Sequence, residues 1–184
     1  GYAKYNDKFY GLPYMYGTQV LFYRKDLFEN IKIQRLFYEQ YRTELKPPKT
    51  WVEYNAIAKF FTKAYNPDSP TLYGTTMGGK FYSGAVCEFL PRKWAFGGKS
   101  FDDNGNVTLN SKEAVKALNN YCESFRYASP TSPEHWWYEQ VDEFCHGKAA
   151  MMVLFMSHAT DITDRYKSEV VGKLGYDIIP GGAP

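Results

Sequence analysis

The feature that most constrains the fold is an unbroken apolar run from Ala149 to Met156, which Gly147 precedes and a polar segment to Asp161 follows. A membrane-spanning helix needs about 20 apolar residues, so the run is too short to cross a bilayer. It is typical of a strand that is buried on both faces in the middle of an α/β sheet. Such sheets bind ligands beyond the carboxyl ends of their strands, so we expect residues 155–158 to lie near a ligand.

Predicted strands and helices alternate through most of the 184 residues. Thr50 with Glu53 has the pattern of a capping box, and Asn110 with Glu113 is a second helix-start signal. Further strands are predicted at 18–23, 72–77 and 174–179, and helices at 33–41, 51–65, 83–96, 110–127, 136–146 and 157–166. The alternation predicts an α/β fold in a single domain.

Composition limits the classes of function. Aromatic residues make up 18% of the chain, with 17 Tyr, 13 Phe and 4 Trp, and we expect some of them to line a pocket or an interface. The formal net charge is +2, without a long run of one sign, which does not indicate nucleic-acid binding. No signal peptide or transmembrane segment is visible in the sequence.

Neither the cysteines nor the histidines have the spacing of a metal centre or a nucleophile pair, so we expect no metal and no cofactor. The cysteines lie in apolar segments and are predicted to be small buried residues: Cys87, Cys122 and Cys145. Residues 102–106 predict a hairpin turn and not a calcium loop, because the required glycine is missing. Gly78, Gly79 and Lys80 leave three interpretations open: phosphate binding, a tight turn, or a pocket wall for another ligand.

Carboxylate pairs for glycoside cleavage need a set separation, and no spacing in this chain singles one out. The acids considered are Glu88, Asp142, Glu143 and Asp161. A solvated helix face explains Asp142 and Glu143 more simply.

Six motifs then occur in one order along the chain. They are Gly11 to Tyr14 with Leu21 to Phe28; Pro47 to Trp51; Trp94 to Gly98; Leu109 to Ser111 with Glu113 and Ala114; Phe144 with Gly147 to Met151; and Gly172 to Tyr176 with Ile179 to Gly182. In this order they resemble the family 1 extracellular solute-binding proteins of ABC importers, the family that is similar to maltose-binding protein.

The resemblance implies one lobe of a type II periplasmic-binding-protein fold, with a central mixed sheet flanked by helices. Residues 1–184 would form a single C-terminal ligand-binding lobe, and the N-terminal lobe would be absent from the chain. Residues 1–17 and 176–184 would be hinge or crossover segments, and 29–46 a helical insertion. Ligand would bind in the cleft between the two lobes.

The resemblance also implies positions for ligand contacts. They lie at the hinge end of the first strand, after the second strand, before the helix that ends at Phe144, and after the buried strand. The residues are Tyr16, Gly17, Lys80, Phe81, Tyr82, Trp137, Phe155 and Met156. Many sugar binders of the family carry an acidic residue where this chain has Leu154.

The predicted function is therefore non-enzymatic: binding of a solute, a carbohydrate or oligosaccharide, and its delivery to the membrane permease of an ABC importer. The location would be extracytoplasmic, with a lipid anchor in the full-length protein and no membrane insertion or nucleic-acid binding by this segment. The alternatives are a binder of another solute, such as a peptide or polyamine, a glycan-acting enzyme, and a protein-interaction module.

Overall fold

A four-stranded mixed sheet forms the centre of the protein, for which a computed structural model describes residues 3–12 and 17–182. The strand order is β4-β5-β3-β6, with β3 at Gln19–Arg24, β4 at Tyr73–Thr75, β5 at Ala149–Phe155 and β6 at Leu174–Asp177. β4 runs parallel to β5, whereas β3 is antiparallel to β5 and β6. The apolar run is therefore an inner strand, and the predicted α/β class with a mixed sheet is confirmed.

The register brings the ends of three strands to one edge of the sheet. Gln19, the first residue of β3, pairs with Phe155 at the end of β5, and Leu21 pairs with Asp177 at the end of β6. The segment after β4 ends at the same edge, because β4 and β5 are parallel.

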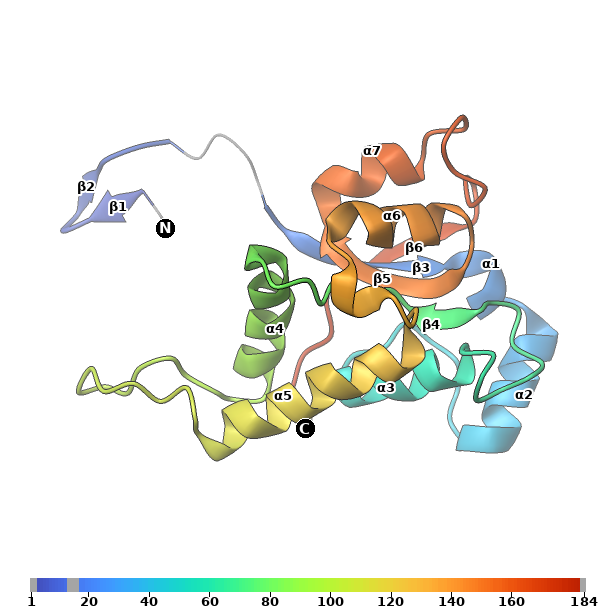
Figure 1. Cartoon of the computed structure of the whole chain (residues 1–184), viewed down its shortest axis with the longest axis horizontal. Helices are drawn as coiled ribbons and strands as arrows, with labels where there is room; N and C mark the ends of the chain where they lie inside the picture. Colours follow the sequence, from blue (N-terminus) through green and yellow to red (C-terminus); the bar gives the residue numbers. More distant parts are fainter. Residues whose placement is uncertain (1–2, 13–16, 183–184) are drawn as a thin grey trace.

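Helices cover both faces of the sheet (Figure 1). α6 (Trp137–Cys145) and α7 (Ala159–Ile162) lie on one face, and α3 (Trp51–Phe60) and α5 (Lys112–Ser124) lie on the other. Successive strand residues point to opposite faces, so Phe22 and Met152 pack in the hydrophobic cluster under α6, and Leu21 and Met151 pack in the cluster with α3. α4 (Ser83–Ala95) stands beside the edge where β3 begins.

The amino-terminal hairpin lies away from this body (Figure 1). Its strands, β1 (Lys4–Tyr5) and β2 (Lys8–Phe9), are antiparallel. Asn6 and Asp7 have φ angles of 45° and 60°, the left-handed conformation that a tight hairpin turn requires.

α3 begins as predicted and ends earlier than predicted. Thr50 and Glu53 make the expected capping box. The helix stops at Phe60 instead of Tyr65, because two downstream side chains take over its last carbonyl groups. Thr62 Oγ1 donates to the Ala58 carbonyl, and Asn66 Nδ2 donates to that of Phe60.

The interpretation of α5 was wrong in two respects. Its N-cap is Ser111 and not Asn110, since Ser111 Oγ accepts the Ala114 N–H at 3.2 Å. Its buried side carries Tyr121 together with small and polar residues, because Asn120 and Ser124 accept hydrogen bonds from the Arg92 guanidinium inside the protein. Val115, Leu118 and Cys122 share one face by their helical spacing in the sequence, which predicts that this face is buried, but all three are exposed.

The last predicted helix is also shorter than expected. A 3-10 turn (Met156–His158) leads into α7, which ends at Ile162, and Thr163 Oγ1 then donates to the Ala159 carbonyl. Two further 3-10 turns lie at Phe125–Tyr127 and Ser132–Glu134. No helix in the described ranges is long and apolar enough to cross a membrane.

The segment predicted as an insertion contains α2 (Ile31–Tyr41), which follows the short helix α1 (Lys25–Phe28). Phe37 and Tyr41 pack edge-on against Phe60 of α3, with ring centroids 5.1 and 6.3 Å away. The helix therefore belongs to the same core, while its status as an insertion stays a prediction.

Candidate ligand-binding site at the open edge of the sheet

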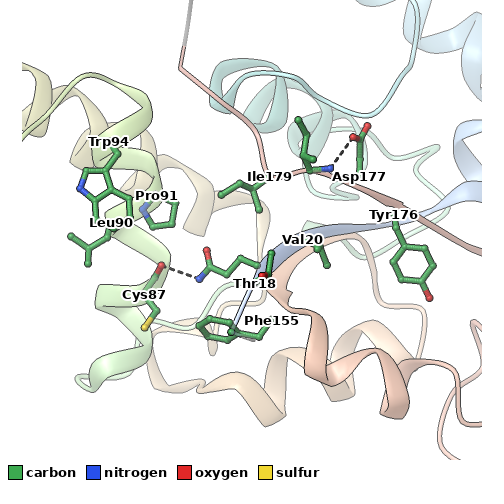
Figure 2. Close-up of a pocket in the computed structure, with 13 residues that line it drawn as sticks. Thr18, Val20, Cys87, Leu90, Pro91, Trp94, Phe155, Tyr176, Asp177 and Ile179 are labelled. Carbon is green, nitrogen blue, oxygen red and sulfur yellow. Dashed lines mark hydrogen bonds between the residues drawn. The ribbon is translucent and has the colours of Figure 1, made fainter. Parts of the chain in front are cut away.

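A groove of about 730 Å³ opens at the edge where β3 begins and β5 and β6 end (Figure 2). Its surface is predominantly apolar, with a few polar groups between the rings and aliphatic side chains. The residues that line it are Gly17, Thr18, Gln19, Val20, Cys87, Leu90, Pro91, Trp94, Phe155, Tyr176, Asp177, Ile178 and Ile179.

A proline in the helical wall explains how α4 attaches to the sheet. Pro91 lies inside α4 and has no N–H, so the Cys87 carbonyl four residues earlier loses its helical partner. Gln19 Nε2, from the first residue of β3, donates to that carbonyl at 3.0 Å (Figure 2). The groove wall is therefore held to the sheet by the hydrogen bond that the proline leaves open.

A row of four aromatic rings leads to the groove. Tyr82 contacts Trp136 at a centroid distance of 5.1 Å, and Trp136 stacks on Trp137 at 5.1 Å with an interplanar angle of 25°. Trp137 then meets Phe155 edge-on at 5.0 Å. Phe155 also lines the groove and is therefore the ring at which the row meets it.

Gly84 allows the two indole rings to approach α4. A Cβ at this position would lie 2.9 Å from Trp136 Cδ1, closer than real Cβ contacts allow, and 3.1 Å from Trp137 Nε1, tighter than most of them. The row therefore depends on a glycine in the first turn of α4.

The loop after β4 uses its backbone donors inside the protein. The amides of Gly79 and Lys80 donate to the carbonyls of Ser132 and His135 at 2.8 and 3.1 Å, and the Gly78 amide donates to the Glu88 carboxyl. None of these three described N–H groups is free for a phosphate. Of the interpretations left open, the geometry favours a tight turn that backs the aromatic row.

The predicted site residues divide into four groups. Gly17 and Phe155 line the groove, and Tyr82 and Trp137 belong to the row. Tyr16 lies outside the described residues. Lys80, Phe81 and Met156 do not line the groove, and the Phe81 side chain is fully exposed.

Sequence reasoning missed Trp136 and the α4 wall. The sequence contained a signal for this wall. Every fourth residue of the segment is apolar or aromatic, which places four of them on one helix face: Tyr82, Val86, Leu90 and Trp94. Cys87, predicted to be buried, is half-buried in the groove wall, whereas Cys145 is buried as predicted.

The carboxylates do not converge on the groove. Among its described lining residues, Asp177 is the one acid, and Lys49 Nζ lies 2.8 Å from its carboxylate and lowers the pKa of that group. Glu143 is buried, so the solvated-face explanation was wrong for this residue. Its Oε2 lies 3.9 Å from His135 Nδ1, in a polar pocket that shares no described lining residue with the groove.

Comparison with known proteins decides the family. The model of the family of bacterial extracellular solute-binding proteins matches residues 1–184. The chain belongs to this family. The family is a solute-binding one, and its extracellular character places the chain outside the cytoplasm.

Relatives of known structure or named ligand agree with the fold. An ABC transporter solute-binding protein from Agrobacterium radiobacter K84, solved with ribitol, is 29% identical with a TM-score of 0.73, over 98% of this chain and 41% of that one. MalE3 of T. maritima, solved with maltose, is 27% identical with a TM-score of 0.70, over 89% and 38%. A mannitol-binding protein from Pseudomonas aeruginosa is 26% identical over 93% of this chain and 36% of its own length. The chain thus spans about two fifths of the length of these relatives.

Proposed function

We propose that this chain is the C-terminal lobe of a two-lobed receptor that binds a carbohydrate or polyol and presents it to the permease of an ABC importer. The observation that carries the proposal is the aromatic row that meets an apolar groove at Phe155. Sugars and polyols have apolar C–H faces that pack on rings, and hydroxyl groups that need a few placed polar partners.

The groove has too few polar groups to satisfy a sugar or polyol alone. Its polar side-chain groups are the hydroxyls of Thr18 and Tyr176, the Trp94 indole N–H, the weakly polar Cys87 thiol, Gln19 and Asp177. Gln19 and Asp177 already have partners within the protein. The remaining hydroxyl groups of the ligand would need hydrogen bonds from another surface, which supports a second lobe that closes on the first.

The position of Leu154 fits this distribution. Many sugar binders of the family carry an acidic residue there, whereas the Leu154 side chain is fully buried in the cluster under α6. A polar ligand contact from this position is therefore not expected, and Phe155 remains the contact from the end of β5. The relatives that bind ribitol, maltose and mannitol support the hydroxyl-rich class of ligand without choosing one member.

We further propose that the protein is not an enzyme. None of Glu88, Asp142, Glu143 and Asp161 is among the described residues of the groove, so a pair of carboxylates that flank one bond is not formed there. A polyamine is disfavoured, because the one groove carboxylate is already paired with Lys49. Lipid anchoring and delivery to a permease belong to the same proposal.

Calorimetry of the complete protein tests the function. Ribitol, mannitol and maltose are titrated in parallel with spermidine and a neutral tripeptide. We expect saturable heat from at least one of the first three ligands and none from the other two. Saturable binding of spermidine or the peptide, with no response to the polyols or the sugar, would sink the carbohydrate proposal.

A further inference from the structure

A buried carboxyl, Glu88, lies behind the groove wall on α4. Its Oε1 accepts a hydrogen bond from Gln140 Nε2 at 2.7 Å, and the backbone N–H of Gly78 lies 3.2 and 3.3 Å from the two carboxyl oxygens. The residue is 9% exposed, and Gln140 is completely buried. The carboxyl therefore makes its contacts inside the protein.

Each partner of Glu88 belongs to a segment that carries a residue of the candidate site. Gln140 follows Trp137 by one turn of α6, and Gly78 begins the loop that leads to Tyr82. Glu88 itself follows Cys87, whose carbonyl group is bonded to Gln19. Because Gln140 Oε1 also accepts from Thr76 Oγ1 at 3.2 Å, one buried chain of hydrogen bonds joins α4, α6 and the end of β4.

The packing around these hydrogen bonds leaves no room for a side chain at residue 78. A Cβ at residue 78 would lie 2.4 Å from Gln140 Nε2 and 2.8 Å from Glu88 Oε1. Glycine at this position lets the backbone reach both side chains directly, so a displacement of the carboxyl is transmitted to the loop and to α6.

No described cation neutralises the carboxyl by direct contact. Arg92 lies one turn further along α4, but its guanidinium donates to Asn120 and Ser124. The other titratable groups whose charges act on Glu88 or respond to it are Tyr54 of α3, Tyr121 of α5 and Cys87 of α4. Burial raises the pKa of Glu88 to about 7, and its hydrogen bonds and Arg92 oppose that rise.

We propose that Glu88 is a positioning residue for the solute site: its uncharged carboxyl holds α4, α6 and residues 76–80 in the binding conformation, and its ionisation loosens them. The inference rests on the proposed function. Ionisation strengthens the hydrogen bonds that Gly78 and Gln140 donate to the carboxyl. The cost of an ionised carboxylate without a paired cation in the interior exceeds that gain, and the entry of water relieves it. Water at this position separates Gly78 and Gln140 from Glu88 and shifts the aromatic row relative to the groove wall.

The affinity for solute is then highest when Glu88 is protonated and falls as the pH rises through about 7. Release of one proton limits the change to about tenfold for each pH unit. An uncharged isostere at this position removes the dependence, whereas loss of a merely structural contact would lower stability without changing the pH profile.

The test compares binding of ribitol, mannitol and maltose to the complete wild-type protein, Glu88→Gln and the control Glu134→Gln, which alters an exposed carboxyl. Between about pH 6 and pH 8.5 we expect the affinity of the wild type and the control to fall about fivefold to tenfold, and that of Glu88→Gln to change less than about twofold. Identical pH profiles in the wild type and Glu88→Gln would overturn the inference.

A second measurement needs no ligand. Amide hydrogen exchange of residues 76–80, expressed as protection factors, is expected to lose protection above about pH 7 in the wild type and not in Glu88→Gln. If none of the three solutes binds and this difference is still observed, the positioning role stands and the proposed function fails. Protection that does not differ between the two proteins overturns the role.

Gln140→Met supplies a variant for the case in which Glu88→Gln does not fold. It removes the contact with α6 and leaves the contact between Glu88 and Gly78 in place. We expect a loss of affinity at about pH 6 of about threefold or more, together with reduced protection of residues 76–80. Wild-type affinity and protection in this variant would contradict the inference.

Discussion

Two aromatic groups in this protein are built from the same residue types and serve different purposes. In the interior, the Arg92 guanidinium carbon lies 3.9 Å from the ring centroid of Trp51, and 5.5 and 5.6 Å from those of Tyr54 and Tyr121. At the sheet edge, the row from Tyr82 to Phe155 has no described cation over its rings and is partly open to solvent. The difference is that a cation covers the rings of the interior group, whereas the rings of the row remain half-buried or exposed without one.

The two groups are alike in leaving some polar atoms unbonded. In the interior group, Tyr54 bonds to the Thr75 hydroxyl and Arg92 donates to Asn120 and Ser124. The Trp51 indole nitrogen and the Tyr121 hydroxyl of that group are nevertheless buried without a partner among the described residues, as are the indole nitrogens of Trp136 and Trp137. The two groups therefore differ in charge and exposure, and not in how completely their polar atoms are bonded.

The largest effect is expected from Arg92→Met, which removes the cation from the interior group. The residue is 2% exposed, so the substitution leaves the side chains of Asn120 and Ser124 without their donor. We expect a loss of about 3 kcal/mol in the free energy of unfolding, measured by urea denaturation. The exposed control Arg126→Met should change it by less than about 0.5 kcal/mol. Equal losses in the two variants would remove the distinction drawn for the interior group.

Gly84→Ala attacks the row through its packing against α4. The new methyl group would displace Trp136 and Trp137, and overpacking of this kind costs about 1–3 kcal/mol. We expect a shift in tryptophan fluorescence together with the loss of stability. Gly11→Ala is the matched control, because a Cβ there meets nothing within 4 Å. An unchanged fluorescence spectrum in Gly84→Ala would show that the row does not depend on this close approach.

Phe155→Leu removes one ring and keeps an apolar side chain of similar size. We expect about a tenfold loss of affinity for the solute, because an aromatic contact is worth about 1–1.5 kcal/mol, with a smaller change in stability. Isothermal titration calorimetry measures the affinity, and Tyr65→Leu, whose ring packs on Tyr127 away from the groove, is the control. The assignment of the row fails if both variants bind like the wild type.

The smallest effect is expected from Asp177→Asn in the groove. Lys49 lowers the pKa of Asp177, so the pair stabilises the folded protein above the unfolded pKa of about 4 and loses that contribution as the pH falls through the lowered value. Lys49 is largely exposed, and the loss at pH 7 should be about 0.5 kcal/mol, vanishing in strong acid. Thermal unfolding of the wild type and Asp177→Asn at pH 7 and in strong acid checks the sign. A loss of stability that grows in acid would contradict it.

Local signals in the sequence were sufficient for several elements. Thr50 and Glu53 sit at a helix start whose cap needs only neighbouring residues. The run from Ala149 is apolar at every position, so both faces had to be buried whichever strands flanked it. The order of six short motifs was sufficient for the family.

Other elements could not be read locally. In α5, apolar spacing predicted the wrong buried face, because Arg92 on another helix draws Asn120 and Ser124 inward. Glu143 was predicted to be a surface acid, but it is buried in the polar pocket beside β4. Leu90 and Trp94 form a groove wall because Gln19 of β3 donates to the Cys87 carbonyl and holds α4 beside the sheet, which no local pattern predicts.

The sequence by itself therefore determined the central strand, the capping box of α3, the α/β class and the family, since these follow from local patterns and from the order of short motifs. Only the tertiary structure decided that Tyr82, Trp136, Trp137 and Phe155 form one row of contacting rings, and that Glu88 lies behind the groove wall. Those arrangements depend on strand register and on hydrogen bonds between residues more than fifty positions apart, such as that between Glu88 and Gln140. Local patterns carry no information about which distant residues meet in this way.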